Sequence, residues 1–178
     1  MVRRMVTEVE PAPEPSDLLT DPRELLVAYL DFYRDAVLRK LDGLSEEELR
    51  GSRLPSGWTP LALLKHLTGV ELRWFRWGFA AEPVDSPWAE NGPDGRWHAG
   101  AEETTEEIKA RFREECDRSR RIIAGADLQE RSRSGGRFNP PGHQPALIWI
   151  LFHVLQEYAR HAGHLDVVRE LADGTVGE

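Results

Sequence analysis

Four side chains that can bind a metal or carry a proton gather within residues 151–170, LFHVLQEYARHAGHLDVVRE. They are His153, Glu157, His161 and His164. A fifth such side chain, His66, lies in a second apolar segment, LALLKHLTGVELRWF. Both segments have helical spacing, and apolar helix faces rarely carry so many polar groups without a function. The sequence therefore predicts a metal site between two helices.

The helical projection separates these residues into two groups. At about 100° per residue, Glu157 and His161 lie within the apolar face of their segment, whereas His153 and His164 lie on its flank. His66 lies in the middle of an apolar face formed by Leu63, Leu67, Val70 and Trp74. A buried carboxylate without a partner costs on the order of several kcal/mol. Glu157 therefore needs a cation or a strong hydrogen-bond donor.

A divalent ion held by His66, Glu157 and His161 would meet this need. Three nitrogen and oxygen ligands with an open fourth position form the catalytic arrangement for zinc, which is the preferred metal. Nickel, iron and manganese are alternatives, because imidazole and carboxylate discriminate poorly between metals. Two competing interpretations need no metal. Glu157 and His161 could form a buried ion pair, and His66 could be a hydrogen-bonded core residue.

Four helices are predicted to position these groups, and their boundaries carry clear signals. Asp21 and Thr59 are capping residues, each followed by a proline at the first helical position. Ser45 and Glu48 predict a capping box in a short helical turn. The expected helices cover residues 22–41, 60–80, 105–124 and 145–172. No segment has a strand pattern, so the expected fold is an all-α four-helix bundle.

Two long connections rich in proline and glycine, residues 81–103 and 125–144, join these helices. The first contains Trp88 and Trp97, which we expect to be packed and which could line an apolar pocket. The second contains three arginines, which we expect to be solvent-exposed, with anion recognition as the alternative. These are Arg131, Arg133 and Arg137. The other tryptophans are expected in the core and in helix packing: Trp58, Trp74, Trp77 and Trp149.

Length and composition restrict the class of protein. The 178 residues predict one domain at 20–174, preceded by a flexible acidic tail at 1–19 that lacks the apolar core of a signal peptide. A net charge of −8 argues against binding to nucleic acid or to an anionic membrane, and no apolar run could span a bilayer. Cys116 is the only cysteine and has no histidine within one turn, so we expect a packed or partly exposed helix residue. Because one cysteine cannot form a disulfide within the chain, we expect a cytoplasmic protein.

Two motifs resemble the DinB/YfiT-like superfamily, most closely its actinobacterial branch of mini-circle and mycothiol-transferase-like proteins. They are GWTPLALLKHLTGVELRWF and the E-x-x-x-H-x-G-H pattern of EYARHAGH. The resemblance covers roughly residues 20 to 174. It implies a four-helix bundle in up-down-down-up order, commonly a homodimer, with a divalent metal between the helices.

The resemblance also assigns site residues. His66 and His161 match two of the superfamily's ligand positions, and Glu157 stands where many relatives have histidine. The mycothiol-dependent maleylpyruvate isomerases of this superfamily also have glutamate there, but their additional C-terminal domain has no counterpart here, so isomerase activity does not carry over. His164 stands where relatives often have glutamine. His153 and His164 are therefore expected to support the ligands from outside the metal's coordination sphere.

The function implied is metal-dependent transfer of a low-molecular-weight thiol, of the mycothiol type, to an electrophile. A metal with an open position can bind a thiol and lower its pKa, so that the thiolate becomes the nucleophile. Two alternatives remain at this point. The open position could hold water in a hydrolase or isomerase, or the bundle could bind a small ligand without catalysis.

Overall fold

The main helices of the chain pack into one bundle in the computed structural model, which describes residues 7–8, 12–140 and 142–176. They are α1 (Pro22–Leu41), α3 (Pro60–Glu71) with its continuation η1 (Leu72–Phe79), α4 (Thr105–Ala124) and α5 (Leu147–Asp173). A short helix, α2 (Glu46–Arg50), connects α1 to α3. The expectation of an all-α protein with about four main helices is confirmed.

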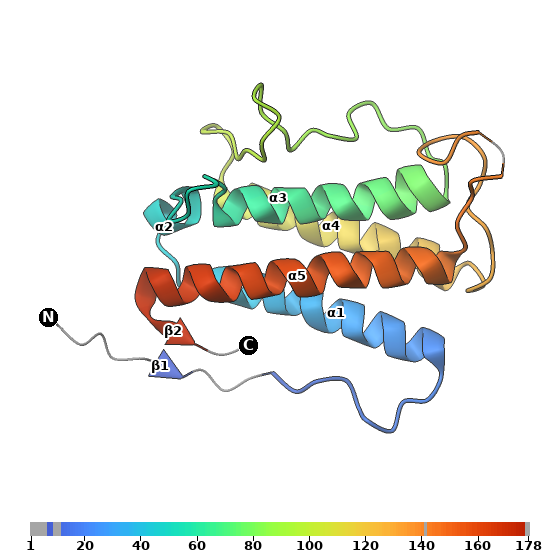
Figure 1. Cartoon of the computed structure of the whole chain (residues 1–178), viewed down its shortest axis with the longest axis horizontal. Coiled ribbons are helices and arrows are strands. Elements are labelled where there is room, and N and C mark those ends of the chain that lie inside the picture. Colours follow the sequence, from blue (N-terminus) through green and yellow to red (C-terminus); the bar gives the residue numbers. More distant parts are fainter. Residues whose placement is uncertain (1–6, 9–11, 141, 177–178) are drawn as a thin grey trace, which may run out of the picture.

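The helices form two parallel pairs that run in opposite directions (Figure 1). Lys40 at the end of α1 pairs with Asp166 near the end of α5, so these two helices run the same way. Lys65 in α3 pairs with Glu103, just before α4, so α3 and α4 start at the same end. The connection between η1 and α4 therefore has to return along the whole length of α3 (Figure 1). This return brings loop residues over His66.

The predicted helix starts are present. Asp21 accepts hydrogen bonds from the backbone N–H groups of Arg23 and Glu24, and Thr59 accepts one from Ala62. Ser45 and Glu48 form the expected capping box. These side chains satisfy N–H groups that have no partner within the helix, and this fixes where each helix begins.

The end of the predicted 60–80 helix is π-helical. In η1 the wider turn is closed by a hydrogen bond from the Ala80 N–H to the Phe75 carbonyl. Gly78 permits this backbone, because a Cβ there would lie 2.7 Å from the Arg73 carbonyl oxygen. Single π-helical turns occur frequently at functional sites. Here the turn carries Arg73 and Trp74, which both contribute to the site described below.

A buried polar network links the four main helices at the centre of the bundle. Arg34 of α1 donates two hydrogen bonds of 2.8 Å to the Glu71 carboxylate of α3. Tyr158 of α5 donates a third, at 2.7 Å. Cys116 of α4 lies 3.8 Å from both Glu71 and Tyr158, and burial raises the pKa of its thiol. Of the two environments expected for Cys116, the packed one is thus confirmed.

The two ends of the described chain meet beside α5. The two-residue strand β1 (Thr7–Glu8) pairs in parallel with β2 (Thr175–Val176). Only β1 lies within the predicted tail at 1–19, of which residues 1–6 and 9–11 lie outside the described residues. That residues 1–19 form a flexible tail remains a prediction. Among the described residues, no helix is long and apolar enough to cross a membrane.

Candidate metal centre

The three residues predicted as ligands come together between α3 and α5. His66, Glu157 and His161 each offer one ligand atom, and these atoms all lie within 4.8 Å of one another. The Nε2 atoms of His66 and His161 lie 3.9 and 3.4 Å from Glu157 Oε2. The His161 side chain is buried, and those of His66 and Glu157 are largely covered. The inward orientation predicted for all three side chains is present.

These separations fit a small divalent ion. Ligand atoms around tetrahedral zinc lie about 3.3 Å apart, given bonds of roughly 2.0–2.2 Å. The 3.4 Å between Glu157 and His161 matches this spacing, whereas the 3.9 Å to His66 is wider, so a side-chain rotation has to bring the His66 nitrogen closer to the ion. Two imidazoles and one carboxylate are ordinary ligands for such an ion. The donor set therefore fits the metal that the sequence suggested.

The two flanking histidines each contact one of these residues. His153 Nε2 lies 3.4 Å from Glu157 Oε1, the carboxylate oxygen that faces away from His66 and His161. His164 Nδ1 lies 3.3 Å from His161 Nδ1, so one of the two rings donates to the other. Neither contact involves Glu157 Oε2 or the Nε2 atoms of His66 and His161. Both histidines are therefore placed to orient ligands, as predicted for residues on the flank of the helix face.

The environment keeps Glu157 ionised and the flanking rings neutral. Contacts with the His161 ring and then the His66 ring hold the pKa of the Glu157 carboxyl far below its usual value. Burial lowers the pKa of His153, although the Glu157 charge opposes this. Burial, followed by the charge of His161, lowers the pKa of His164. The ionised carboxylate is the form in which Glu157 can bind a metal cation.

A carboxylate that the sequence analysis missed lies behind His66. Glu90, from the connection between η1 and α4, places Oε1 3.7 Å from His66 Nδ1. This buried Nδ1 has no hydrogen-bond partner within 3.5 Å, so Glu90 is the acceptor placed to meet it. Burial alone would raise the pKa of Glu90, but His66 and Arg73 outweigh it and the net direction is downward. A carboxylate behind a ligating histidine commonly fixes the ring and its tautomer.

Glu90 is itself held by buried neighbours. Arg73 of η1 donates a hydrogen bond to Glu90 Oε1 and a second, of 2.9 Å, to the Pro87 carbonyl. Its guanidinium lies 4.1 Å from the centre of the Trp88 ring. Gly69 makes room for the pair, because a Cβ there would lie 2.5 Å from Arg73 Nη1 and 2.8 Å from Glu90 Oε1. The orientation of Glu90 is therefore determined by α3, η1 and the loop together.

A small hairpin presents Glu90 and Trp97 to the same histidine. The His98 N–H donates to the Glu90 carbonyl at 2.7 Å, and Gly95 turns the chain with a φ of +75°. Trp97 then stacks on His66, with ring centres 3.8 Å apart and an interplanar angle of 17°. It also meets His161 edge-on at 5.3 Å. Trp97 thus covers the His66 and His161 side of the site from solvent.

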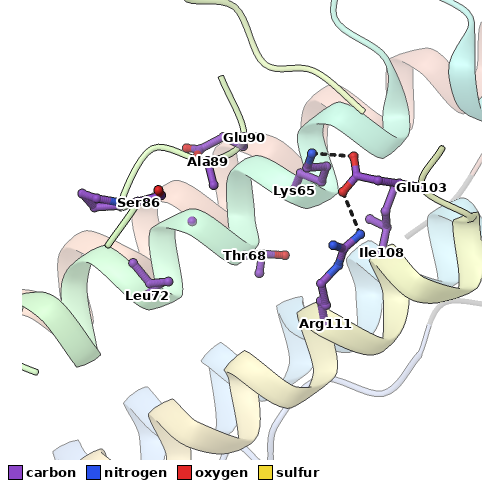
Figure 2. Close-up of a pocket in the computed structure, with 11 residues that line it drawn as sticks. Lys65, Thr68, Leu72, Ser86, Ala89, Glu90, Glu103, Ile108 and Arg111 are labelled. Atoms are coloured by element: carbon purple, nitrogen blue, oxygen red, sulfur yellow. Dashed lines mark hydrogen bonds and ion pairs between the residues drawn. The ribbon is translucent and has the colours of Figure 1, made fainter. Parts of the chain in front are cut away.

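A separate cavity of about 170 Å³ lies on the far side of Glu90, between α3, the loop and α4. None of the three proposed ligands lines it. Glu103 joins Lys65 and Arg111 across the cavity wall by ion pairs of 2.7 Å each (Figure 2). These charges are satisfied by one another. The cavity is therefore a neighbour of the Glu90 carboxylate and lies outside the metal centre.

Three predictions about the surroundings need correction. Trp88 was expected to be packed, but its side chain is 49% exposed. Trp149 was expected in the core, but its side chain is 52% exposed and stacks on His153 with an interplanar angle of 9°. Its other ring contact is with Trp74 of η1, at 5.7 Å between ring centres, so it packs between helices without entering the core. Arg137 was expected to be solvated, yet it is half-buried against Trp74. The exposure predicted for Arg131 and Arg133 is confirmed.

Comparison with known proteins gives a single informative result. No curated protein matches the chain. A family model described as mycothiol-S-transferase matches residues 25–174, which include all but the first three residues of the four main helices and every residue of the site. The resemblance inferred from the two motifs is thus confirmed over most of the chain. The chain belongs to the mycothiol-S-transferase family.

Proposed function

We propose that this protein is a metal-dependent mycothiol S-transferase whose metal is bound by His66, Glu157 and His161. The observation that carries the proposal is the convergence of these three ligand atoms within 4.8 Å, in a chain of this family. When bound, the metal would supply a Lewis acid that lowers the pKa of the thiol. Zinc is preferred because the donor set leaves one position open, and nickel, iron and manganese remain alternatives.

In this proposal, each neighbouring residue has a defined task. Glu157 supplies negative charge at the ligand position, and Glu90 accepts the His66 Nδ1–H, so that the lone pair of Nε2 faces Glu157. Trp97 excludes water above His66. His153 and His164 fix the orientation of Glu157 and His161 by the contacts described above. A rigid set of ligands lowers the reorganisation needed when the thiol binds.

The remaining family expectations are also part of the proposal. The opposed helix pairs correspond to the up-down-down-up order of DinB-like bundles. A homodimer is supported by an apolar groove between α1 and α5, where Phe152 and Trp149 are more than half exposed. A cytoplasmic location follows from the reducing conditions that a thiol substrate and the lone thiol of Cys116 require.

Metal-loaded protein is expected to accelerate transfer of mycothiol to electrophiles, and the activity should disappear when a chelator removes the metal. Product formation by mass spectrometry, with and without the thiol, measures this directly. Turnover of a substrate without any thiol would favour the hydrolase or isomerase alternative. Absence of both stoichiometric metal and turnover would favour a bundle that only binds a ligand.

Replacing Glu90 by glutamine is expected to weaken metal binding about 10–100-fold, because the carboxylate that orients His66 loses its charge. The Kd is measured by competition with a chromogenic chelator. Glu82→Gln is the matched control, since Glu82 follows η1 in the same connection, pairs with Arg76 and does not contact the ligands. Equal metal affinity in the Glu90 and Glu82 variants would show that Glu90 does not position His66.

A further inference from the structure

Arg137 differs from every other arginine that is buried or half-buried in the described part of the chain. Each of the others donates to a carboxylate or to a backbone carbonyl, as Arg34 does to Glu71 and Arg23 does to Ile123. The Arg137 guanidinium has no hydrogen bond and no ion pair among the described residues. A guanidinium presents five N–H donors, and none of the Arg137 nitrogens is among the fully buried unpaired atoms of the described residues, so these donors are open to a ligand.

The surroundings of Arg137 are aromatic and cationic. Its guanidinium carbon lies 4.3 Å from the centre of the Trp74 ring and 5.8 Å from that of Trp88. Burial, followed by the charge of Arg73, lowers the pKa of Arg137. Glu90 forms its ion pair with Arg73, so this carboxylate does not neutralise the positive charge of Arg137. The Trp74 and Trp88 rings and the unpaired Arg137 guanidinium together form a surface that suits a planar anion.

This position borders the metal centre through direct contacts. Trp74, which packs on Arg137, also lies 4.0 Å from the His153 ring, measured between ring centres. His153 in turn contacts Glu157. Trp97 covers the opposite part of the site, over His66 and His161. A chain of contacts therefore links Arg137 through Trp74 and His153 to Glu157.

We propose that the electrophile accepted by this protein carries an anionic group of the carboxylate class, which Arg137 binds. The inference rests on the proposed function, since it assigns the second substrate of the same site. A planar guanidinium binds a carboxylate through two parallel N–H···O bonds while its face stacks on an aromatic ring. Arg137 already stacks on Trp74, so its edge is the part left for the anion.

Two alkylating agents that differ in one group test this assignment: iodoacetate, which is anionic, and iodoacetamide, which is neutral. With either, the C–S bond forms as the C–I bond breaks, iodide leaves with the bonding pair, and the thiol proton passes to solvent. Each enzymatic kcat/KM is divided by the rate constant for free mycothiol. The wild-type protein is expected to favour iodoacetate by about tenfold or more, as for a charged hydrogen bond in a partly dry site.

Replacing Arg137 by methionine is expected to bring this ratio to about one, and Arg137→Lys should give an intermediate ratio because it keeps the charge but not the planar fork. Arg133→Met, in an exposed arginine of the same connection, should keep the wild-type ratio. Circular dichroism and the thermal midpoint establish that each variant is folded. An unchanged ratio in Arg137→Met, a wild-type ratio near one, or a loss confined to the KM of the thiol would overturn the proposal.

Failure of the proposed function is distinguishable from failure of this inference. If the metal-loaded wild type transfers the thiol to neither reagent, the transferase proposal fails. A binding experiment then tests separately whether Arg137 binds a carboxylate. Succinate is then titrated while tryptophan fluorescence is followed, because Trp74 and Trp88 flank the guanidinium. Saturable binding to wild type and Arg133→Met, but not to Arg137→Met, supports the position. Equal responses in all three proteins overturn it.

Discussion

Replacing His66 by alanine is expected to remove nearly all bound divalent metal while the bundle remains folded. His66 is the only proposed ligand on α3, so its loss leaves two ligands on one face of α5, four residues apart. Affinity should fall by about 100-fold or more, since the loss of a group that only orients a ligating side chain already costs roughly 10–100-fold. The helices should persist, because the bundle has an extensive apolar core and does not fold around a metal as a zinc finger does.

Metal content by mass spectrometry of untagged protein, together with circular dichroism, measures both parts of this prediction. His98→Ala is the matched control, because His98 is exposed and is not one of the three clustered ligands. His153→Ala and His164→Ala should each reduce affinity less than His66→Ala, because both contact ligand residues without joining the group of three. Full metal content in the His66 variant would refute the site as drawn.

The sequence was most informative where local chemistry decides the structure. Caps such as Asp21 and Thr59 satisfy backbone groups within a few residues of themselves, so their presence fixed the helix starts to within one or two positions. The inward direction of Glu157 and His161 followed from the period of one helix. Their meeting with His66 required only that two amphipathic helices pack by their apolar faces.

The residues that support the site could not be predicted in the same way. The turn dipeptides Asn91–Gly92 and Asp94–Gly95 do indicate that the chain reverses between Glu90 and Trp97. Nothing in that signal says which helix the reversal will lie against, because this depends on the parallel arrangement of α3 and α4. The partners of Arg73 and Arg137 depend on the same long-range packing. Local patterns therefore identified the candidate ligands that come together but not the groups placed around them.

Replacing Glu71 by leucine is expected to lower the free energy of unfolding by about 3–5 kcal/mol, the second large effect predicted for this protein. The change leaves the Arg34 charge buried without a counter-ion and removes the acceptor of the Tyr158 hydroxyl. Both Arg34 and Glu71 are almost fully buried, so water cannot replace the lost contacts. Urea denaturation followed by circular dichroism measures the loss.

The double variant Arg34→Met, Glu71→Leu separates the cost of an unpaired charge from the value of the pair. It should recover much of the lost stability, because two apolar side chains can fill the space and no isolated charge remains. Glu46→Gln is the exposed control. It breaks the ion pair with Arg50 at the surface, where solvent screens both charges, and should leave the stability nearly unchanged. If the double variant is as unstable as the sum of its single changes predicts, the loss of stability does not come from the unpaired charge. The buried network would then stabilise the fold by more than its ion pair does.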